Sequence, residues 1–271
     1  MPESRVVLIT GASAGFGKRT AELLAARGWR VFGTSRRPES AEARGFDMLP
    51  LDVTSDESVR ACVAEVMGRA GRLDALVNNA GRLIIAAVEE AGPEQIRSLV
   101  ETNLLGVVRM DQAVLPIMRK QGGGRIVTVG SIAGLIGLPF SALYCATKFA
   151  LEGYVAGLRI EVAGFGIGVS LVEPGTFKTH LHETTPPPTN PLPEYEAARA
   201  RAVRRSLRRA EQWPDPAVVA RLILRILEAR RPRLRYRVGP GAISIPLALW
   251  LLPDSLREKL IRRYFRIGVG G

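Results

Sequence analysis

Short apolar runs alternate along the chain with longer stretches in which apolar side chains recur every three or four residues. The short runs predict buried strands, and the longer stretches predict amphipathic helices. Strands are expected at residues 5–10, 30–35, 47–53, 73–78, 125–129 and 167–172. Helices are expected after the first turn as far as residue 27, and at residues 55–69, 93–120 and 140–163. Because strand and helix alternate without a break, we predict an α/β fold with a parallel, doubly wound sheet.

The length of the chain fits one such domain. Its 271 residues are ample for a core and too few for a second full domain. We therefore expect a single domain over residues 1–271, with residues 5–180 as the core and residues 181–271 as a helical lid and basic C-terminal extension. The proline-rich stretch 186–193 predicts a stiff loop in this lid. The first strand begins within five residues of the start, which leaves no room for a signal peptide, so we expect a cytoplasmic protein.

Cysteine and histidine give little support for a metal site. Cys62 and Cys145 fall in different predicted helices without zinc spacing, which indicates a reducing compartment and no structural metal. His180 and His182 lie two residues apart and could ligate a metal, but no cysteine or acidic cluster accompanies them. We expect no metal, and we interpret the histidine segment as the start of a mobile lid.

A glycine-rich turn joins the first predicted strand to the first predicted helix. Such a turn is typical of a dinucleotide site, because glycines let backbone N–H groups approach a pyrophosphate at a helix N-terminus. Glycines also end strands for purely structural reasons. The candidate cofactor residues in this turn are Gly11, Ser13, Gly15, Phe16 and Gly17.

Arg36 and Arg37 follow the second predicted strand, about twenty residues beyond the glycine turn. An acidic residue there would bind the ribose hydroxyls of NAD(H), whereas arginine accommodates the 2′-phosphate of NADP(H). We therefore predict NADP(H) in preference to NAD(H). The alternative is that both are solvated loop arginines. Asp52 ends the third strand, at the sheet edge where open α/β folds bind ligands.

Tyr144 and Lys148 lie four positions apart in a predicted helix and so share one face. A phenol has an ordinary pKa of about 10, and a nearby cation lowers it. Such a Tyr can protonate a carbonyl oxygen, or take the proton from an alcohol, while hydride moves to or from a cofactor. Ser131, after the fifth strand, could hold the same oxygen. This spacing of Tyr and Lys also occurs in helices by chance.

Together these segments resemble the short-chain dehydrogenase/reductase family, strongly over residues 5–180 and loosely beyond. The resemblance rests on TGASAGFG at residues 10–17, NNAG at residues 78–81, Asn103, Ser131, YCATK at residues 144–148, and Pro174-Gly175 followed by Thr179. It implies a Rossmann fold and a catalytic tetrad of Asn103, Ser131, Tyr144 and Lys148. Tyr144 would be the acid/base and Ser131 would orient the substrate oxygen. Lys148 would lower the Tyr pKa and bind the nicotinamide ribose, and Asn103 would hold a relay water.

The resemblance also implies further cofactor contacts and an assembly. Asp52 and Asn79 would lie near the adenosine, and Thr179 near the nicotinamide carboxamide. The remaining cofactor contacts implied by the matched motifs are Ala80, Gly81, Pro174 and Gly175. The family pairs its subunits through the helices that hold Asn103 and Tyr144, so we expect a homodimer or homotetramer. Small residues in the second helix, Ala156, Gly157 and Ala163, permit close approach.

The segments beside the predicted site are apolar. Residues 132–140 carry no charge and no side-chain hydrogen-bond donor, and residues 83–85 add Leu and Ile. Such a pocket favours a hydrophobic substrate over a sugar, although these residues could also simply pack the core. Within the family, the LVEPG run and the C-terminal sequence resemble the branch that acts on steroids, retinoids and other lipophilic carbonyls.

We therefore expect an NADP(H)-dependent oxidoreductase that moves hydride between nicotinamide and a hydrophobic carbonyl or secondary alcohol. One alternative is a reductase of ketones carried as acyl thioesters on a carrier protein or CoA. The other is a non-catalytic NADP-binding or sensing protein. An intact tetrad disfavours this last reading, because binding alone needs no Tyr beside a Lys.

The net charge of +12 is concentrated after residue 198. Residues 199–237 carry +10 and residues 238–271 carry +3, against −1 for residues 1–198. Apolar residues recur at helical spacing at positions 200, 203, 207 and 210, where arginines surround them. They recur again at positions 256, 260, 264 and 267. The apolar run 242–252 contains Trp250 and is too short to span a bilayer.

A peripheral contact with an anionic membrane is one hypothesis. A solvated lid and an acidic carrier or CoA thioester are the others, and we do not expect nucleic acid as a partner.

Overall fold

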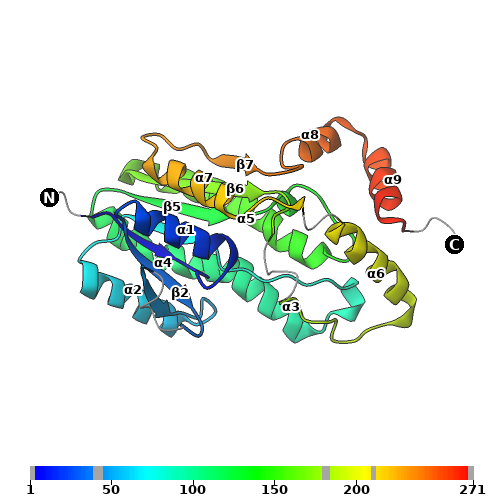
Figure 1. The fold of residues 1–271 in the computed structure, drawn as a ribbon, viewed down its shortest axis with the longest axis horizontal. Helices are drawn as coiled ribbons and strands as arrows, with labels where there is room; N and C mark the ends of the chain where they lie inside the picture. The colour runs from blue at the N-terminus through cyan, green and yellow to red at the C-terminus, as the bar shows by residue number, and fades with distance from the viewer. Residues whose placement is uncertain (1–3, 39–44, 179–183, 209–211, 268–271) are drawn as a thin grey trace.

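A seven-stranded parallel sheet forms the centre of the computed structural model, which describes residues 4–38, 45–178, 184–208 and 212–267 (Figure 1). The strand order is β3-β2-β1-β4-β5-β6-β7, and every neighbouring pair is parallel. The strands are β1 (Val6–Ile9), β2 (Arg30–Ser35), β3 (Asp47–Pro50), β4 (Ala75–Asn78), β5 (Gly124–Val129), β6 (Ile167–Pro174) and β7 (Arg235–Val238). This order confirms the predicted doubly wound Rossmann fold. The order reverses between β1 and β4, which is where open α/β sheets form their ligand crevice.

Helices cover both faces of the sheet. Helices α1 (Gly15–Ala26) and α7 (Ala217–Glu228) pack together on one face, and α2 (Asp56–Ala70), α4 (Gly106–Lys120) and α5 (Ala142–Glu161) cover the other. Alternate strand residues face opposite layers, so Val7 and Ile9 join the α1–α7 side while Val6 and Leu8 join the α2–α4–α5 side. Both faces of the strands are therefore buried, as a parallel sheet requires.

The structure confirms the six predicted strands, with some bounds changed. The third ends at Pro50 rather than at residue 53, because the Asp52 carboxylate accepts hydrogen bonds from the Thr54 N–H and hydroxyl and turns the chain toward α2. Ser55 caps that helix, since its hydroxyl accepts from the Ser58 N–H at 3.2 Å. The sixth strand runs two residues further than predicted, to Pro174.

The predicted helix over residues 93–120 is interrupted. It consists of α3 (Pro93–Val100), a π-helical turn η3 (Glu101–Leu105) and α4. The turn contains Asn103, whose side chain bonds the Arg82 backbone instead of facing solvent. Such π turns are rare and occur mostly at functional sites.

The helix of Tyr144 and Lys148 begins at Ala142, two residues later than predicted. Phe140 has a backbone φ of +59°, a left-handed conformation that no helix continues. Three short 3₁₀ turns, η2 (Val88–Glu90), η4 (Ile132–Gly134) and η5 (Ala163–Phe165), complete the core. Of these, η4 is part of the apolar segment 132–140, and the chain just before η2 contacts that segment, because the Ala86 N–H donates to the Phe140 carbonyl oxygen at 2.8 Å.

The C-terminal third adds a lid helix, an edge strand and a helical pair. The lid helix α6 (Pro193–Leu207) follows the proline-rich loop, and α8 (Ser244–Leu251) and α9 (Asp254–Phe265) follow β7. Figure 1 shows α8 and α9 standing apart from the sheet, beyond its β7 edge. Within the described residues, no helix combines the length and apolar content needed to cross a membrane. Thr179, His180, His182 and the predicted helical position 210 lie outside the described residues.

Candidate active site

A cavity of about 580 Å³ opens at the carboxyl ends of the strands, at the reversal of strand order. Its wall contains the glycine turn, the ends of β2 and β3, the NNAG segment, and the start of α5. Segments far apart in the sequence therefore meet at one crevice, as the strand order predicts.

The glycine turn is shaped for close approach to a ligand. Gly11 has φ of +68°, and a Cβ placed on Gly17 would lie 2.3 Å from the Gly11 carbonyl oxygen. Only glycine fits at position 17, and this lets α1 begin directly against the turn. The Asn79 amide locks the turn by donating to the carbonyl oxygens of Thr10 and Gly11, at 3.0 and 2.9 Å. These features fit the pyrophosphate of a dinucleotide at a helix N-terminus.

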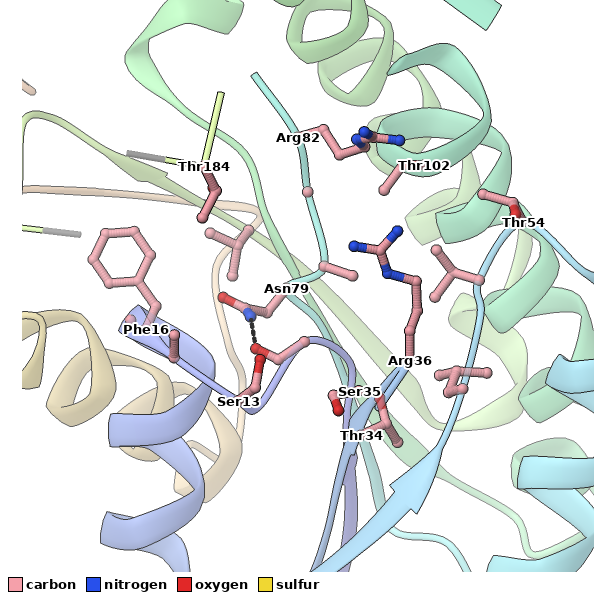
Figure 2. Close-up of a pocket in the computed structure, with 18 of the residues that line it drawn as sticks. Ser13, Phe16, Thr34, Ser35, Arg36, Thr54, Asn79, Arg82, Thr102 and Thr184 are labelled. Atoms are coloured by element: carbon pink, nitrogen blue, oxygen red, sulfur yellow. Dashed lines mark hydrogen bonds between the residues drawn. The ribbon is translucent and has the colours of Figure 1, made fainter. Parts of the chain in front are cut away.

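Two guanidinium groups face the other end of the cavity from opposite sides (Figure 2). Arg36 comes from the end of β2, and Arg82 comes from the segment after NNAG. Asp52 lies within the electrostatic reach of both. Partial burial alone would raise the pKa of Asp52, but the hydrogen bonds from Thr54 and the two guanidinium groups lower it below its ordinary value. Within the described residues neither arginine forms an ion pair within 4 Å, so both remain available to an anionic ligand.

Tyr144 and Lys148 line the same cavity from the first turns of α5. The buried Lys148 donates from Nζ to the Val129 carbonyl oxygen at 2.9 Å, and this nitrogen lies 5.7 Å from the centre of the Tyr144 ring. Burial lowers the pKa of Lys148 to about 8. The backbone contact thus fixes the ammonium beside the phenol.

The environment of Tyr144 differs from the expectation that Lys148 lowers its pKa. Burial raises the pKa of Tyr144 to about 12, against a smaller lowering by its hydrogen bond with Ser131. The loss of hydration of the phenolate is the largest influence, and the lysine at this distance does not offset it. Tyr144 is therefore a protonated phenol at neutral pH. Ser131 lies at the end of β5, where its hydroxyl also accepts from the Ala133 N–H at 3.1 Å.

Asn103 is buried behind the NNAG segment rather than exposed in the cavity wall. Its amide oxygen accepts from the Arg82 N–H at 2.7 Å, and its amide nitrogen donates to the Arg82 carbonyl oxygen at 2.9 Å and to the Thr147 hydroxyl at 3.2 Å. Asn103 thus connects the NNAG segment to the helix of Tyr144 and Lys148.

The structure brings most of the predicted site residues together. Eleven of the predicted cofactor residues line the cavity, namely Gly11, Ser13, Gly15, Phe16, Arg36, Asp52, Asn79, Ala80, Gly81, Tyr144 and Lys148. Gly17 packs behind the turn, and Arg37, Pro174 and Gly175 do not line the cavity. Gly175 instead packs against Pro240, where a Cβ would lie 2.2 Å from the carbonyl oxygen.

Several lining residues were missed by the sequence reasoning. Arg82 follows NNAG directly, and its basic side chain beside a predicted turn was a usable signal. Ser98 lies on α3 and Thr102 on the π turn. Nothing in the sequence indicated these two residues, because only the interrupted helix turns them toward the cavity. The other lining residues that the sequence did not single out are Ala14, Thr34, Ser35, Leu51, Val53, Thr54, Val129, Gly130 and Thr184.

A second cavity of about 600 Å³ lies between the segment after Ser131 and the C-terminal helices. Leu135, Ile136 and Gly137 line one side, and side chains of α8 and α9 line the other. Arg237 and Arg257 are the two charged residues in its wall. This cavity is mostly apolar, as the uncharged loop predicts.

No group of three or more His, Cys, Asp or Glu side chains suited to a metal occurs in the described part of the chain. Cys62 and Cys145 are buried and free, and burial raises the pKa of both thiols, that of Cys62 to about 12. A neutral, buried thiol is a poor nucleophile, so we assign Cys145 to core packing on the helix that carries Tyr144.

Comparison with known proteins agrees with this geometry. The family model described as short chain dehydrogenase matches residues 5–189. The 3-ketodihydrosphingosine reductase of Bacteroides thetaiotaomicron is 37% identical over 98% of this chain and 99% of its own length. Estradiol 17-beta-dehydrogenase 1 of Rattus norvegicus is 38% identical over 86% of this chain and 73% of its own.

Solved structures of short-chain dehydrogenases have a similar fold. A short-chain dehydrogenase from Streptomyces avermitilis is similar with a TM-score of 0.80 and 35% identity, over 99% of this chain and all of the other. The structure of ElxO with NADP bound is similar with a TM-score of 0.72 and 28% identity, over 89% of this chain and 99% of the other. From its sequence, its fold and the residues gathered at its crevice, the chain belongs to the short-chain dehydrogenase/reductase family and is an NAD(P)-dependent oxidoreductase.

Proposed function

We propose that the protein is an NADP(H)-dependent reductase of a hydrophobic ketone. The observation that carries this proposal is the arrangement of a single cavity, which holds Tyr144 and Lys148 at one end and Arg36 with the glycine turn at the other. A dinucleotide is long enough to connect these ends, and the residues present fit its phosphates. Binding alone would not require a buried phenol beside a buried ammonium.

The bound nicotinamide supplies the hydride, and the protein supplies the proton and the orientation. In this proposal Ser131 donates a hydrogen bond to the substrate carbonyl oxygen, and the Tyr144 hydroxyl gives that oxygen its proton. Lys148, fixed by the Val129 carbonyl, places a positive charge beside the phenol and stabilises the phenolate that remains. Asn103 acts through the Arg82 backbone, as a positioning residue.

Tyr144 can supply the proton that reduction of a carbonyl needs. Burial raises its pKa to about 12, so the group is protonated at neutral pH. The same group takes the proton back when the alcohol is oxidised.

The preference for NADP(H) rests on positive charge at the adenosine end of the cavity. Arg36 follows β2, at the position where arginine accommodates a 2′-phosphate. Arg82 faces the same space from the other wall (Figure 2). Charge-assisted hydrogen bonds from guanidinium to phosphate are among the strongest in proteins. A bound NADP in the similar ElxO structure supports the same choice.

The substrate class is proposed from the apolar surfaces and from the relatives. Leu135 and Ile136 follow Ser131 and line the second cavity, and the buried Leu83 and Ile84 follow the NNAG segment. By its name, the relative from Bacteroides thetaiotaomicron reduces a sphingoid ketone, and the relative from Rattus norvegicus is a dehydrogenase of a steroid. We therefore favour a ketone attached to a long or polycyclic hydrocarbon. Ketones on acyl thioesters remain the second candidate, supported by the acyl-carrier-protein reductase FabG of Escherichia coli, 37% identical over 66% of this chain.

Pairing of two subunits through α5 is also proposed. Phe149 and Ile160 are exposed on this helix, and Gly153 and Gly157 between them leave room for a close neighbour. Changing Ile160 to Glu would place a charge at the expected contact. Sedimentation equilibrium should then show dissociation, while an unchanged assembly would place the interface elsewhere.

The buried, free cysteines favour a reducing location, which we propose to be the cytoplasm.

A panel of carbonyl compounds tests the proposed function. The panel contains 3-ketodihydrosphingosine, a steroid ketone, retinal, an acetoacetyl thioester and a hydrophilic sugar ketone, each followed by the loss of NADPH absorbance. The proposal expects turnover of at least one hydrophobic ketone and none of the sugar. Turnover of the sugar ketone alone would contradict the substrate class, and no turnover of any carbonyl would favour a binding or sensing protein.

A further inference from the structure

The two helices after β7 carry most of the large apolar side chains that the described chain exposes. We call residues 242–267, which contain α8 and α9, the C-terminal arm. Trp250 is 74% exposed, Leu251 66% and Ile243 63%. The other large apolar side chains exposed on the arm are Ile245, Leu247, Leu256, Leu260 and Tyr264. Large exposed apolar side chains that gather on one element of a folded domain indicate a contact surface.

The exposed surface belongs to an ordered element rather than to a loose tail. The inner face of α9 carries the buried Phe265, and the Arg205 guanidinium of α6 lies 4.6 Å from the centre of the Tyr264 ring. Arg257 connects the two arm helices by donating to the Trp250 carbonyl oxygen at 3.3 Å. The arm is thus attached to the domain through α6, and its two helices lie at the periphery of the molecule (Figure 1).

Basic side chains border the apolar surface. The arm contains five basic and two acidic residues. Asp254 pairs with Arg257 and Glu258 pairs with Arg262, whereas Lys259, Arg263 and Arg266 form no ion pair within the described residues. Leu256, Lys259, Leu260 and Arg263 share one face of α9, because helix positions three and four apart are neighbours. Apolar and cationic groups therefore face the same side.

We propose that the C-terminal arm docks on the surface of an anionic lipid bilayer. Amphipathic helices with basic residues and an exposed Trp lie in the membrane interface, where the Trp ring sits at headgroup level and the cations meet anionic lipids. The eight residues of α8 are uncharged and too few to span a bilayer, so the contact is peripheral. A second copy of the chain suits this surface less well, because a twofold contact would bring two positively charged arms together.

The cavity behind the arm gives this docking a consequence for the reaction. The second cavity is lined by Leu247, Trp250 and Ile261 of the arm and by the loop residues Leu135 and Ile136. Because Leu247 and Trp250 are also exposed, this cavity borders the apolar surface of the arm. An arm resting on a bilayer holds this apolar cavity next to the lipid phase. We infer that a lipophilic ketone enters from the membrane by this route, and this step rests on the proposed function.

Sedimentation with lipid vesicles tests the docking. The full chain is mixed with phosphatidylglycerol vesicles or with phosphatidylcholine vesicles, at low and at high salt. We expect binding to the anionic vesicles, weakened by salt because the Debye length shortens. Equal binding to both lipids, or binding to neither, would overturn the proposal.

Two double variants and one control locate the contact. Trp250→Ser with Leu251→Ser should lower the partition coefficient for anionic vesicles at least tenfold, because it removes two apolar anchors. Lys259→Gln with Arg263→Gln should lower it by more than tenfold, at about fivefold for each basic residue near an anionic surface. Arg60→Gln removes an exposed charge on α2, far from the arm in sequence and element, and should leave it within twofold. Unchanged binding in both arm variants would contradict the assignment.

Trp fluorescence shows whether Trp250 itself enters the bilayer. Brominated phosphatidylglycerol should quench part of the emission of the wild type, and the Trp250→Phe variant should lose that part. Quenching that persists unchanged in the variant would mean that another Trp approaches the lipid and would contradict the proposal. Loss of a concentration-dependent oligomer in the Trp250→Ser, Leu251→Ser variant, without vesicle binding by the wild type, would assign the arm to a protein contact instead.

Turnover of a water-soluble ketone separates this proposal from the proposed function. The Lys259→Gln, Arg263→Gln variant, whose changed residues do not line the second cavity, should reduce such a ketone at the wild-type rate. Both arm variants should lose rate with a vesicle-bound ketone. A wild type that binds anionic vesicles but reduces no carbonyl would refute the function and leave the docking intact. Wild-type rates with the vesicle-bound ketone in both arm variants would refute the membrane route alone.

Discussion

Asn103 holds the backbone of Arg82 by both of its polar groups. Its amide oxygen accepts from the Arg82 N–H at 2.7 Å, and its amide nitrogen donates to the Arg82 carbonyl oxygen at 2.9 Å. The π turn of η3 directs this side chain inward, so the segment after NNAG is fixed relative to the α3–α4 helix. The position of the Arg82 guanidinium in the cavity depends on this pair.

Replacing Asn103 with Ala should therefore weaken both the fold and cofactor binding. The change removes two hydrogen bonds to partly buried backbone groups of Arg82, at a cost of about 0.5–1.5 kcal/mol for each bond. We expect a lower urea midpoint with an unchanged slope, and a higher Kd for NADPH. Asn103→Asp keeps the acceptor for the Arg82 N–H but buries a carboxylate against the Arg82 carbonyl oxygen, so its urea midpoint should also lie below that of the wild type. A wild-type midpoint in Asn103→Ala would show that the contact does not hold the segment.

Arg36 and Arg82 should each contribute to the preference for NADPH. Changing Arg36 to Gln should raise the Kd for NADPH by about 10- to 150-fold, as expected for loss of one charge-assisted contact of about 1.5–3 kcal/mol. The Kd for NADH should stay within twofold. Arg82→Gln should act in the same direction by a smaller factor.

Arg37→Gln is the matched control, because Arg37 is the adjacent arginine and does not line the cavity. Titration of cofactor fluorescence gives all of these constants at one moderate salt concentration. Equal Kd values for NADPH and NADH in the wild type would contradict the predicted preference. An effect of Arg37→Gln as large as that of Arg36→Gln would show that only the general charge of the region matters.

Asp111 should make the stability depend on pH. Its buried carboxylate accepts from the Asn78 amide at 2.8 Å and from the Tyr154 hydroxyl at 2.9 Å, yet burial raises its pKa to about 7. A carboxyl whose pKa is higher in the folded state binds its proton more tightly there. Its contribution is fully present below the unfolded pKa of about 4 and is lost as the pH rises through about 7. Asp111→Asn should remove this loss.

Urea unfolding of the wild type and Asp111→Asn at pH 4, 6 and 8 measures the effect. The difference in unfolding free energy between the two proteins should change in favour of the variant as the pH rises. One pKa unit corresponds to about 1.4 kcal/mol, so a change on the order of a few kcal/mol is expected. Parallel pH curves for the two proteins would contradict the raised pKa.

Glu90 should hold the lid helix to the core. Its carboxylate is fully buried and accepts from the Arg199 guanidinium of α6, from the Leu192 N–H and from the Ala87 N–H. Although burial alone would raise the pKa of Glu90, these hydrogen bonds lower it below its ordinary value. Glu90→Gln keeps the shape but removes the ion pair, so α6 should loosen.

Limited proteolysis and kinetics together measure this loosening. Cleavage at the arginines of α6 should become faster in Glu90→Gln, and the KM for a hydrophobic ketone should rise while the Kd for NADPH stays within twofold. Glu94→Gln is the control, since Glu94 is exposed and pairs only with the neighbouring Arg97. Wild-type cleavage rates in Glu90→Gln would mean that other contacts, such as Tyr195 with Phe140, hold the lid.

The sequence was sufficient for the sheet and for most of the cavity, because both follow from local patterns. The apolar runs define β1 to β6, and the glycine turn and NNAG are contiguous motifs whose place at the strand ends follows from the fold. β7 was missed because its residues, Arg-Tyr-Arg-Val, alternate charged and apolar side chains within a strongly basic stretch. Its arginines instead pair with the buried Glu173 of β6 and with Glu152 of α5.

Features that depend on three-dimensional surroundings could not be predicted. The π turn at Asn103 forms because the side chain finds partners in Arg82 and Thr147, which lie 21 and 44 residues away. The pKa of Tyr144 is set by how deeply the phenol is buried, and a spacing of four residues says nothing about that. Arg82 was present in the sequence, but only the fold shows that it faces Arg36.

The rate with Tyr144→Phe shows whether Tyr144 is the acid of the reaction. The variant removes one hydroxyl and should keep the fold and the cavity, so its Kd for NADPH should stay within about twofold. With the ketone that the wild type reduces fastest, turnover should fall by about 10²–10⁴, the usual contribution of a positioned acid. Lys148→Arg keeps the charge but not the compact ammonium, so its turnover should lie between those of the wild type and Tyr144→Phe. Near-normal turnover in Tyr144→Phe, with the same ketone and the same cofactor affinity, would contradict the account.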